Sequence, residues 1–327
     1  DKALDDAIAY ALSMGVTQTH NMGTWSDLET FMRAKEDGRL KMRVYSVVPL
    51  STWERLRDFV AENGRGDDRL WWGGLKGFVD GSLGSTTAWF YEAYADDPST
   101  SGLLLTDTAA LRRWVYDADE AGFQLITHAI GDQANDWLLD VYEEAIQRNG
   151  QGDKRFRIEH AQHLSPEAFP RFQALGVVPA MQASHAIDDG RWAEKRIGPV
   201  RINTTYAFKS LLDNGATLSF GSDWTVAPMD VLTGIYAALT RRTTDGANPD
   251  GWVPAERISL EEALKAYTWG SAFAGFVEEK VGQLVPGKYA DLVVLSEDLF
   301  RLDPVEIPSV QVDLTIVNGD VVFRKEE

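Results

Sequence analysis

Cysteine is absent from this chain of 327 residues, and its absence removes three kinds of chemistry at once. Without cysteine there is no disulfide framework, no thiolate zinc site and no cysteine nucleophile. Basic residues are also scarce, because 32 Lys and Arg stand against 50 Asp and Glu and leave a net charge of −18. A field of that sign repels nucleic acid and anionic membrane surfaces, so we expect neither as a partner.

Long apolar runs and several familiar motifs are missing as well. No run approaches the ~18 residues of a membrane span, and no P-loop, G-x-G-x-x-G after a strand or G-x-S-x-G elbow occurs. No His-x-His pair is found anywhere in the chain. The chain opens on DKALDDAIAYALSMG, a helical pattern without an initiator Met, and we interpret it as part of a longer protein. We expect a cytoplasmic location; a targeting segment upstream of residue 1 would not be visible.

Strand-like apolar runs alternate with helical patterns over most of the chain. Seven such runs occur, at residues 16–20, 42–48, 75–81, 123–129, 156–161, 177–182 and 218–223. This alternation predicts a parallel sheet covered by helices, the α/β class. Seven units are one short of a closed eightfold barrel, so we predict strands two to eight of a TIM-type (β/α)8 barrel whose first strand precedes residue 1. An open α/β sheet is the alternative.

Helix starts are indicated by short polar patterns. Ser26 with Glu29, and Ser259 with Glu262, each have the spacing of a capping box. Asp132 is placed to cap a helix whose inner face is apolar. These patterns predict helices that begin just after residues 26, 132 and 259.

The strand–helix alternation gives way to a pattern of short strands after about residue 282. GQLVPGKYADLVVLS and VDLTIVNGDVVF are patterns of short strands, and Asn318-Gly319 is a type I′ hairpin signal. We therefore predict a barrel over residues 1–282 and a small β unit over residues 283–327. The long segments 82–106 and 183–204 directly follow barrel strands and are expected to form the rim of the carboxyl face.

Four different strand runs carry a side chain that can bind a metal ion: Lys76, His128, His160 and Asp223. The carboxyl ends of barrel strands converge on one face, so these groups can meet there. Each also has an ordinary structural explanation, such as a Lys76–Asp80 ion pair, hydrogen-bonded histidines, or Asp223 as a helix N-cap. Their order on successive strands favours a metal centre.

Further polar residues lie near the same strand ends but have no spacing that specifies a metal. We predict that five of them contact substrate or support the ligands: Asp80, His163, His185, Trp224 and His20. Glu159 is excluded, because alternation along a strand points its side chain away from that of His160.

The segments LKGFVDGSLGSTTAWF, THAIGDQAND, RIEHAQHLSPE, VVPAMQASHA, FGSDW and GQLVPGKYADLVVL together resemble the metal-dependent amidohydrolase superfamily. Within it the chain is most similar to amidohydrolase family 3, the N-substituted formamide deformylase-like group. The resemblance implies a barrel with a small β-sandwich assembled from both chain ends, of which residues 283–327 would be the C-terminal part. The family commonly has Arg where this chain has Thr86, and the chain departs from the pattern there.

The resemblance also implies a ligand set: a His-x-His pair, a carboxylated lysine, two histidines and an aspartate. Lys76, His128, His160 and Asp223 match the last four positions, and the pair would precede residue 1. The site would hold one or two divalent ions, with Zn²⁺ the expected metal, and would lower the pKa of water to near ~7. Asp223 would be the catalytic residue that moves protons during cleavage of a C–N amide or formamide bond.

The missing pair predicts an incomplete metal site and an enzyme fragment with reduced or no activity. Two alternatives stay open: a non-catalytic remnant that binds a small molecule or partner chain, and a mononuclear deaminase of the same superfamily. The expected partner is a small-molecule amide substrate, and a homo-oligomer is compatible with the sequence.

Overall fold

The computed structural model describes residues 1–326, and its central feature is a seven-stranded parallel sheet in sequence order from β1 to β7. Every neighbouring pair is parallel. The strands are β1 (Gln18–Met22), β2 (Arg43–Pro49), β3 (Leu70–Phe78), β4 (Gln124–Ala129), β5 (Arg157–His160), β6 (Val178–Met181) and β7 (Ser219–Phe220). Each of the seven predicted runs overlaps one of these strands, so the prediction of a parallel α/β sheet is confirmed.

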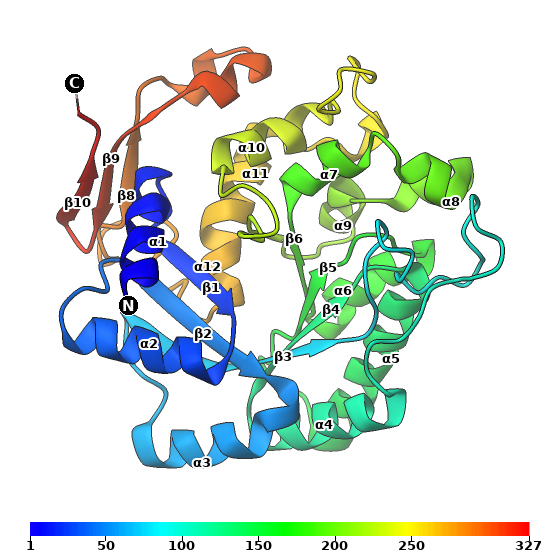
Figure 1. The fold of residues 1–327 in the computed structure, drawn as a ribbon, viewed down its shortest axis with the longest axis horizontal. Helices are drawn as coiled ribbons and strands as arrows, with labels where there is room; N and C mark the ends of the chain where they lie inside the picture. The colour runs from blue at the N-terminus through cyan, green and yellow to red at the C-terminus, as the bar shows by residue number, and fades with distance from the viewer. Residues whose placement is uncertain (327) are drawn as a thin grey trace.

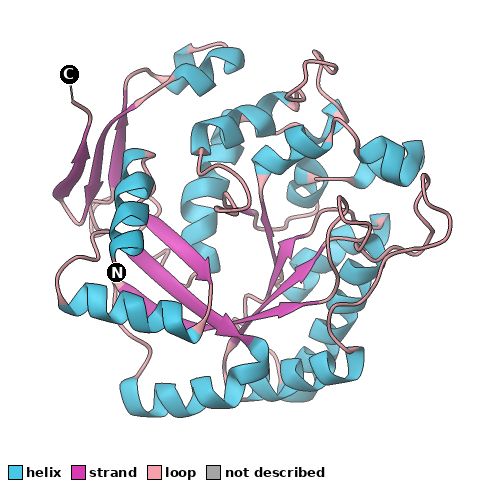
Figure 2. Ribbon diagram, viewed as in Figure 1, coloured by secondary structure: helices cyan, strands magenta, loops and turns pink. Residues whose placement is uncertain are grey.

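Twelve α-helices lie within residues 1–326, and most of them cover the outside of the curled sheet (Figures 1 and 2). They are α1 (Lys2–Ser13), α2 (Trp25–Glu36), α3 (Trp53–Asn63), α4 (Thr108–Glu120), α5 (Asp132–Asn149), α6 (Phe169–Leu175), α7 (Ala183–Asp189), α8 (Ala193–Arg201), α9 (Phe208–Asp213), α10 (Val231–Thr240), α11 (Leu260–Lys265) and α12 (Ser271–Ala274). Within the described residues β1 and β7 are not hydrogen-bonded to each other. The sheet is therefore a curled part of a barrel, as predicted.

The strands are buried on both faces, because helices pack outside them and side chains fill the curled interior. On β2 the alternation is plain: Val44 and Val48 join the large core shared with the helices. Tyr45 and Val47 point the other way and form a second cluster with Ile126 of β4. This two-sided burial is typical of parallel strands in α/β folds and explains their nearly continuous apolar sequences.

The start of α2 corrects one predicted cap. The spacing of Ser26 and Glu29 predicts a capping box, but the helix begins earlier and Thr24 is its N-cap. Thr24 has extended backbone angles, its hydroxyl accepts the Asp27 N–H, and its own N–H donates to the Asp27 carboxylate at 2.6 Å. Two overlapping box patterns occur in this sequence, and the upstream one is the one the helix uses.

Of the other two predicted helix starts, one is confirmed and one is corrected. The box of Ser259 and Glu262 is present at the start of α11, as predicted. Asp132 is instead the first residue inside α5, and Gly131 is the N-cap. Its carboxylate accepts the N–H of Tyr91 at 3.0 Å, so it holds the rim segment 82–106 against the helix rather than capping it.

A separate three-stranded antiparallel sheet lies beside α1, with the order β10-β9-β8 (Figure 1). Its strands are β8 (Leu292–Leu295), β9 (Val312–Val317) and β10 (Asp320–Arg324). Asn318 and Gly319 both have positive φ, 57° and 87°, so the predicted type I′ hairpin is confirmed. The Thr315 hydroxyl donates to the Leu12 carbonyl at 2.6 Å and ties this sheet to α1.

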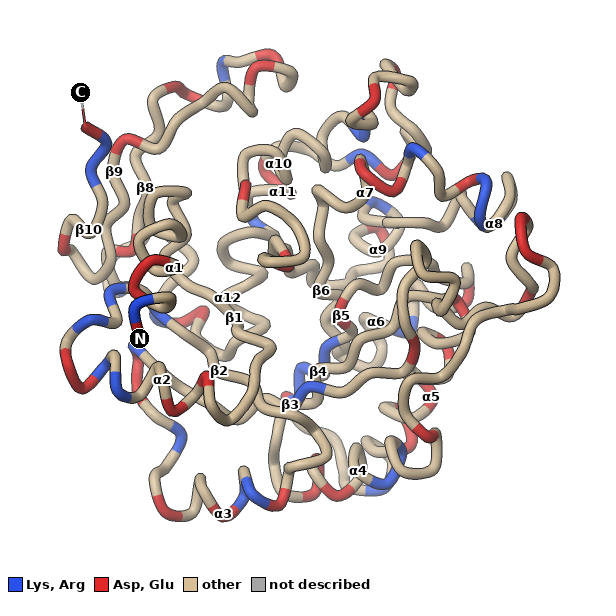
Figure 3. The backbone as a smooth tube through the Cα atoms, viewed as in Figure 1, with Lys and Arg blue, Asp and Glu red and all other residues tan. Residues whose placement is uncertain are grey.

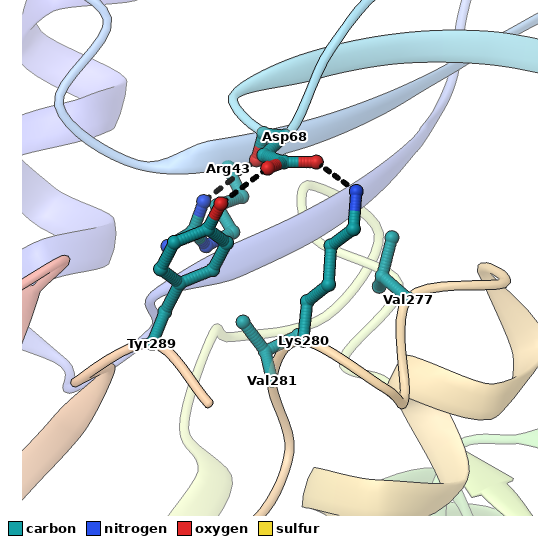
Figure 4. A pocket seen from close by; sticks show the side chains of 6 residues that line it. All are labelled: Arg43, Asp68, Val277, Lys280, Val281 and Tyr289. Carbon is teal, nitrogen blue, oxygen red and sulfur yellow. Dashed lines mark hydrogen bonds and ion pairs between the residues drawn. The ribbon is translucent and has the colours of Figure 1, made fainter. Parts of the chain in front are cut away.

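A cluster of charged and aromatic side chains joins the small sheet to the base of the barrel sheet (Figure 4). Arg43 donates twice to the Asp291 carboxylate, at 2.6 and 2.9 Å, and both side chains are almost fully buried. Lys280 and the Tyr289 hydroxyl bind the Asp68 carboxylate next to them. Ion pairs therefore connect segments more than two hundred residues apart in sequence.

Charged residues lie mostly on the outer helices and loops, where both signs are interspersed (Figure 3). None of the helices in residues 1–326 combines the length and the apolar character that crossing a membrane requires.

Candidate metal centre

Three side chains that follow consecutive strands meet at the carboxyl end of the barrel sheet. His160 ends β5, His185 lies on α7 directly after β6, and Asp223 follows β7. Each offers one ligand atom, and these atoms all lie within 4.8 Å of one another. The sequence predicts His160 and Asp223 as ligands and His185 only as a supporting or substrate contact. The structure places His185 in the same group as the other two.

Lys76 and His128 complete the set of predicted ligands and come from the neighbouring strands β3 and β4. The His128 and His160 rings are 4.5 Å apart between centroids. Lys76 is buried, and burial lowers its pKa to about 8, while the nearby carboxylates of Glu159 and Asp223 oppose that shift. The structure thus brings all four predicted positions to one end of the sheet.

Hydrogen bonds fix the orientation of both strand-end imidazoles. Nδ1–H of His160 donates to the Gln182 side-chain oxygen at 2.7 Å, which leaves Nε2 with its lone pair. Nε2–H of His128 donates to the Gly81 carbonyl at 2.8 Å, which leaves Nδ1. Burial lowers the pKa of both rings, that of His128 to about 4, so both are neutral near pH 7. Such partners on the far nitrogen are what metal-binding histidines require.

The side chains of the other two members of the group, His185 and Asp223, have no hydrogen-bonding partner among residues 1–326. Both side chains are partly exposed, and the pKa shifts of both arise from desolvation and nearby charges alone. Their ligand atoms converge with that of His160, and without an internal partner both are available to contact an ion. Imidazole nitrogens and a carboxylate oxygen are a donor set that suits Zn²⁺. The residues present therefore fit a divalent ion.

Two of these residues have backbone angles that non-glycine residues rarely adopt. The φ of His160 is 76° and that of Asp223 is 58°, both in the left-handed region. Angles of this kind cost free energy and are concentrated at functional sites. In this structure they turn each side chain at the end of its strand.

The turn at His160 corrects the exclusion of Glu159. Strand alternation predicts that Glu159 points away from the site, but the left-handed residue that follows breaks the alternation. The Glu159 carboxylate is buried, acts electrostatically on both Lys76 and Asp223, and lies 2.7 Å from the Arg157 guanidinium. Glu159 therefore belongs to the surroundings of the candidate ligands.

Asp80 supports the loops around the site. Its buried carboxylate accepts the backbone N–H groups of Trp89, Ile130 and Gly131 at 2.8, 3.0 and 2.9 Å. Nε2 of His128 is 3.7 Å from Asp80 Oδ1. Asp80 thus fastens the segment after β3 to the segment after β4 and lies beside one candidate ligand.

The other predicted supporting residues are dispersed. His163 is buried away from the ligand group, with Nδ1 bound to the Thr205 hydroxyl at 2.8 Å. His20 lies deeper in the sheet interior, where Arg157 donates to its Nδ1 at 2.7 Å. Trp224 follows Asp223 and is 41% exposed, so it faces solvent near the site.

The rim segments 82–106 and 183–204 are fastened to each other by two arginines of α8. Arg196 donates to the Thr86 hydroxyl and to Asp96 at 2.9 Å. Arg201 donates to the carbonyls of Glu92 and Ala93 at 3.0 and 2.8 Å. At Thr86, where the resemblance leads us to expect Arg, the guanidinium comes from Arg196 in another part of the chain.

The sequence pattern of the amidohydrolase family matches residues 1–323. The chain belongs to the amidohydrolase family. It is 40% identical over 308 residues to Protein LONG AFTER FAR-RED 3 of Arabidopsis thaliana, covering 90% of this chain and 52% of that protein. It is 32% identical to the putative amidohydrolase YtcJ of Bacillus subtilis, covering 99% of this chain and 61% of that protein.

Two solved structures of metal-dependent hydrolases are similar to this chain in sequence and in fold. An uncharacterized metal-dependent hydrolase from Pyrococcus horikoshii has a TM-score of 0.83 and 30% identity, with 92% of this chain and 60% of that chain covered. One from Pyrococcus furiosus has a TM-score of 0.77 and 32% identity, with 88% and 57% covered. This chain spans between 52% and 61% of the length of these four relatives.

Proposed function

We propose that the chain carries the catalytic face of a metal-dependent hydrolase that cleaves a C–N bond of a small-molecule amide or formamide. The observation that carries this proposal is the convergence of His160, His185 and Asp223 beside Lys76 and His128. Family membership and the likeness to metal-dependent hydrolases support it. The formamide class is supported by 29% identity over 215 residues to an N-substituted formamide deformylase of Arthrobacter pascens.

His160, His185 and Asp223 would hold the ion, and we propose Zn²⁺ because neutral imidazole and carboxylate are its common ligands. When bound, a divalent ion supplies Lewis-acid chemistry, since it polarises a carbonyl and lowers the pKa of water. The chain provides the neutral state of the histidines through burial, and Gln182 holds the His160 ring in place.

Asp223 is the residue best placed to move a proton. Burial raises the pKa of its carboxyl group to about 6, Lys76 opposes that rise and Glu159 adds to it. At neutral pH the group is mostly ionised and can accept a proton, yet it is basic enough to hold one until the amine leaves. A pKa close to the working pH is what general acid–base catalysis requires.

Lys76 is proposed to react with dissolved CO2. Its amine is buried and has no hydrogen-bonding partner among residues 1–326, and its lowered pKa leaves part of it neutral. The neutral Nζ would attack the carbon of CO2, form an N–C bond and release one proton to water. The resulting carbamate is an anion that can contact metal, which accounts for a lysine in this buried position.

A site with one ion is the second candidate, and one observation favours it. Only His160, His185 and Asp223 group within 4.8 Å among the histidine and acidic side chains of residues 1–326. Lys76 would then act by its charge alone, as in the mononuclear deaminase alternative.

Metal content and hydrolysis, measured on the same samples, test these proposals. The chain is dialysed against Zn²⁺ with and without bicarbonate, assayed by elemental analysis, and tested with N-alkylformamides. We expect at least one bound Zn²⁺ and, because the chain has no His-x-His pair, formate release that is slow. His160→Asn and His185→Asn should lose that ion, and Asp223→Asn should lower kcat by about 100-fold or more, as for a lost acid–base group.

His163→Asn is the matched control, because this histidine is three residues from His160 but outside the ligand group. It should keep the ion. Lys76→Met separates the two candidates: loss of a second, bicarbonate-dependent ion supports the carbamate, and unchanged metal content supports the single-ion site. Zinc that stays bound in both His160→Asn and His185→Asn would overturn the ligand assignment. Bound metal without turnover of any amide would favour a non-catalytic binding protein.

A further inference from the structure

Strand pairing does not hold the two histidines of the candidate metal centre together. The register between β5 and β6 ends at Glu159 and Ala180. His160 follows that point and His185 lies on α7, so both are beyond the last paired residues. His160 and Ala161 have left-handed φ angles of 76° and 42°, which turn the chain out of the sheet where the pairing ends. Contacts other than the backbone ladder must therefore set the distance between the two imidazoles.

Helix α7, which carries His185, is attached to the end of β5 at both of its own ends. At its beginning, the side-chain oxygen of the N-cap residue Gln182 accepts Nδ1–H of His160 at 2.7 Å. At its last residue, Asp189 Oδ2 accepts the side-chain amide of Gln162 at 2.8 Å. The two residues on the β5 side are only two positions apart, so the helix has two fixed points beside the end of that strand.

The attachment at the end of α7 is buried and includes a third segment of the chain. Gln162 and Tyr206 are 3% and 1% exposed. The Tyr206 hydroxyl donates to the same Asp189 oxygen at 2.7 Å, and the Tyr206 N–H donates to the Gln162 carbonyl at 2.8 Å. His163 Nε2 lies 3.0 Å from the Gln162 amide nitrogen and fixes the orientation of that amide. We call Gln162, Asp189 and Tyr206 the carboxylate bridge. A fully bonded buried network of this kind makes the segments that it joins rigid.

We propose that the carboxylate bridge holds His185 at metal-binding distance from His160, with Gln162 and Asp189 as positioning residues. This inference rests on the proposed metal centre. The ligand atoms of the two histidines lie within 4.8 Å of each other, and Zn²⁺ contacts imidazole nitrogens at about 2.0–2.1 Å. A displacement of α7 by about 1 Å would lengthen one of these contacts beyond its normal value. Removing an outer contact that orients a metal ligand typically lowers metal affinity by about 10- to 100-fold.

Zn²⁺ affinity, measured by titration calorimetry on the metal-free chain, tests the proposal. Gln162→Leu and Asp189→Leu each remove one partner of the bridge and should weaken Zn²⁺ binding by about tenfold or more. Asp189→Asn keeps the oxygen that accepts both donors, so it should retain most of the affinity. Tyr206→Phe removes only the second donor and should cause a smaller loss than Gln162→Leu.

Asn149→Leu is the matched control, because Asn149 makes the same kind of amide-to-carboxylate bond between α5 and α4, to Asp119 at 2.9 Å. This variant should lower the free energy of unfolding in urea but leave Zn²⁺ affinity unchanged. Equal affinity in Gln162→Leu and the unchanged chain would overturn the proposal. An equal loss of affinity in Asn149→Leu would also overturn it, because the effect would then follow from lower stability alone.

The measurement requires no turnover, so a chain that binds Zn²⁺ but hydrolyses no amide still tests the bridge. A chain that binds no Zn²⁺ would refute the proposed metal centre, and NMR of the metal-free, ¹⁵N-histidine-labelled protein then decides the inference. The His185 ring signals are those that disappear in His185→Asn. Gln162→Leu should shift them, because it releases the end of α7, whereas Asn149→Leu should not. Unchanged His185 signals in Gln162→Leu would refute the positioning role.

Discussion

Among single residues, Asp189 is expected to make the free energy of unfolding depend on pH. The Tyr206 hydroxyl and the Gln162 amide both donate to its Oδ2, at 2.7 and 2.8 Å. Burial raises the pKa of Asp189 from 3.8 to about 6 despite these bonds. The folded chain therefore holds this proton more tightly than the unfolded chain does. The free energy of unfolding should fall as pH rises from about 4 to 6, by up to ~3 kcal/mol from this residue.

Asp189→Asn isolates that contribution, because both donors bind one oxygen that asparagine retains. Urea unfolding at pH 4.5 and pH 8 should show a smaller pH-dependent loss of stability in this variant, by about 2 kcal/mol. Asp58→Asn, at an exposed carboxylate on α3, should not alter the dependence. An identical pH profile for Asp189→Asn and the unchanged chain would show that Asp189 is not responsible.

Side chains at strand ends were the part of the site that sequence could predict. Lys76, His128, His160 and Asp223 each follow an apolar run, and the carboxyl ends of parallel strands must share one edge. His185 had no such constraint, because a helix rather than a strand positions it. The direction of the Glu159 side chain was not predictable, because residue types do not reveal the left-handed φ of His160. Backbone conformation, not chemistry, set that limit.

At the scale of elements, the start of α2 offers a direct comparison between two overlapping caps. Thr24 makes the side-chain and backbone bonds of the box, whereas Ser26 lies inside the helix. Thr24→Ala should lower the free energy of unfolding by about 1 kcal/mol, because it leaves an N–H at the helix end unpaired. Ser26→Ala should change it by less than about 0.5 kcal/mol, as for an ordinary surface substitution. Urea unfolding of both variants at pH 7 measures the difference, and equal losses would contradict the assignment.

Element positions were predictable because period-two and apolar-run patterns persist over several residues, whereas helix starts depend on one or two bonds. All seven strand runs overlap the strands observed. The hairpin at Asn318-Gly319 was also predictable, since few residues other than glycine and asparagine tolerate positive φ. The spacing of Ser26 and Glu29 predicts a later start than the one observed, and the helix begins at Trp25, whose side chain is buried.

Across the whole molecule, the attachment of the small sheet to the barrel was not predictable from sequence. Arg43 and Asp291 are 248 residues apart, and nothing local marks them as partners. Their side chains are 4% and 5% exposed, and Asp291 also accepts the Asn318 N–H at 2.8 Å. One buried carboxylate thus holds both the base of β2 and the β9–β10 hairpin.

Removing the charge of Asp291 should therefore loosen the small sheet. Asp291→Asn keeps the shape but removes the carboxylate that is paired with the buried Arg43 guanidinium, at a cost of about 3–5 kcal/mol. The neighbouring Lys280–Asp68 pair is much more exposed, at 52% and 35%, so Lys280→Met should cost under about 1 kcal/mol. Urea unfolding gives both values, and limited proteolysis should show faster cleavage near residues 282–292 only in Asp291→Asn. Similar small losses in the two variants would mean that apolar contacts with α1, rather than this ion pair, hold the sheet in place.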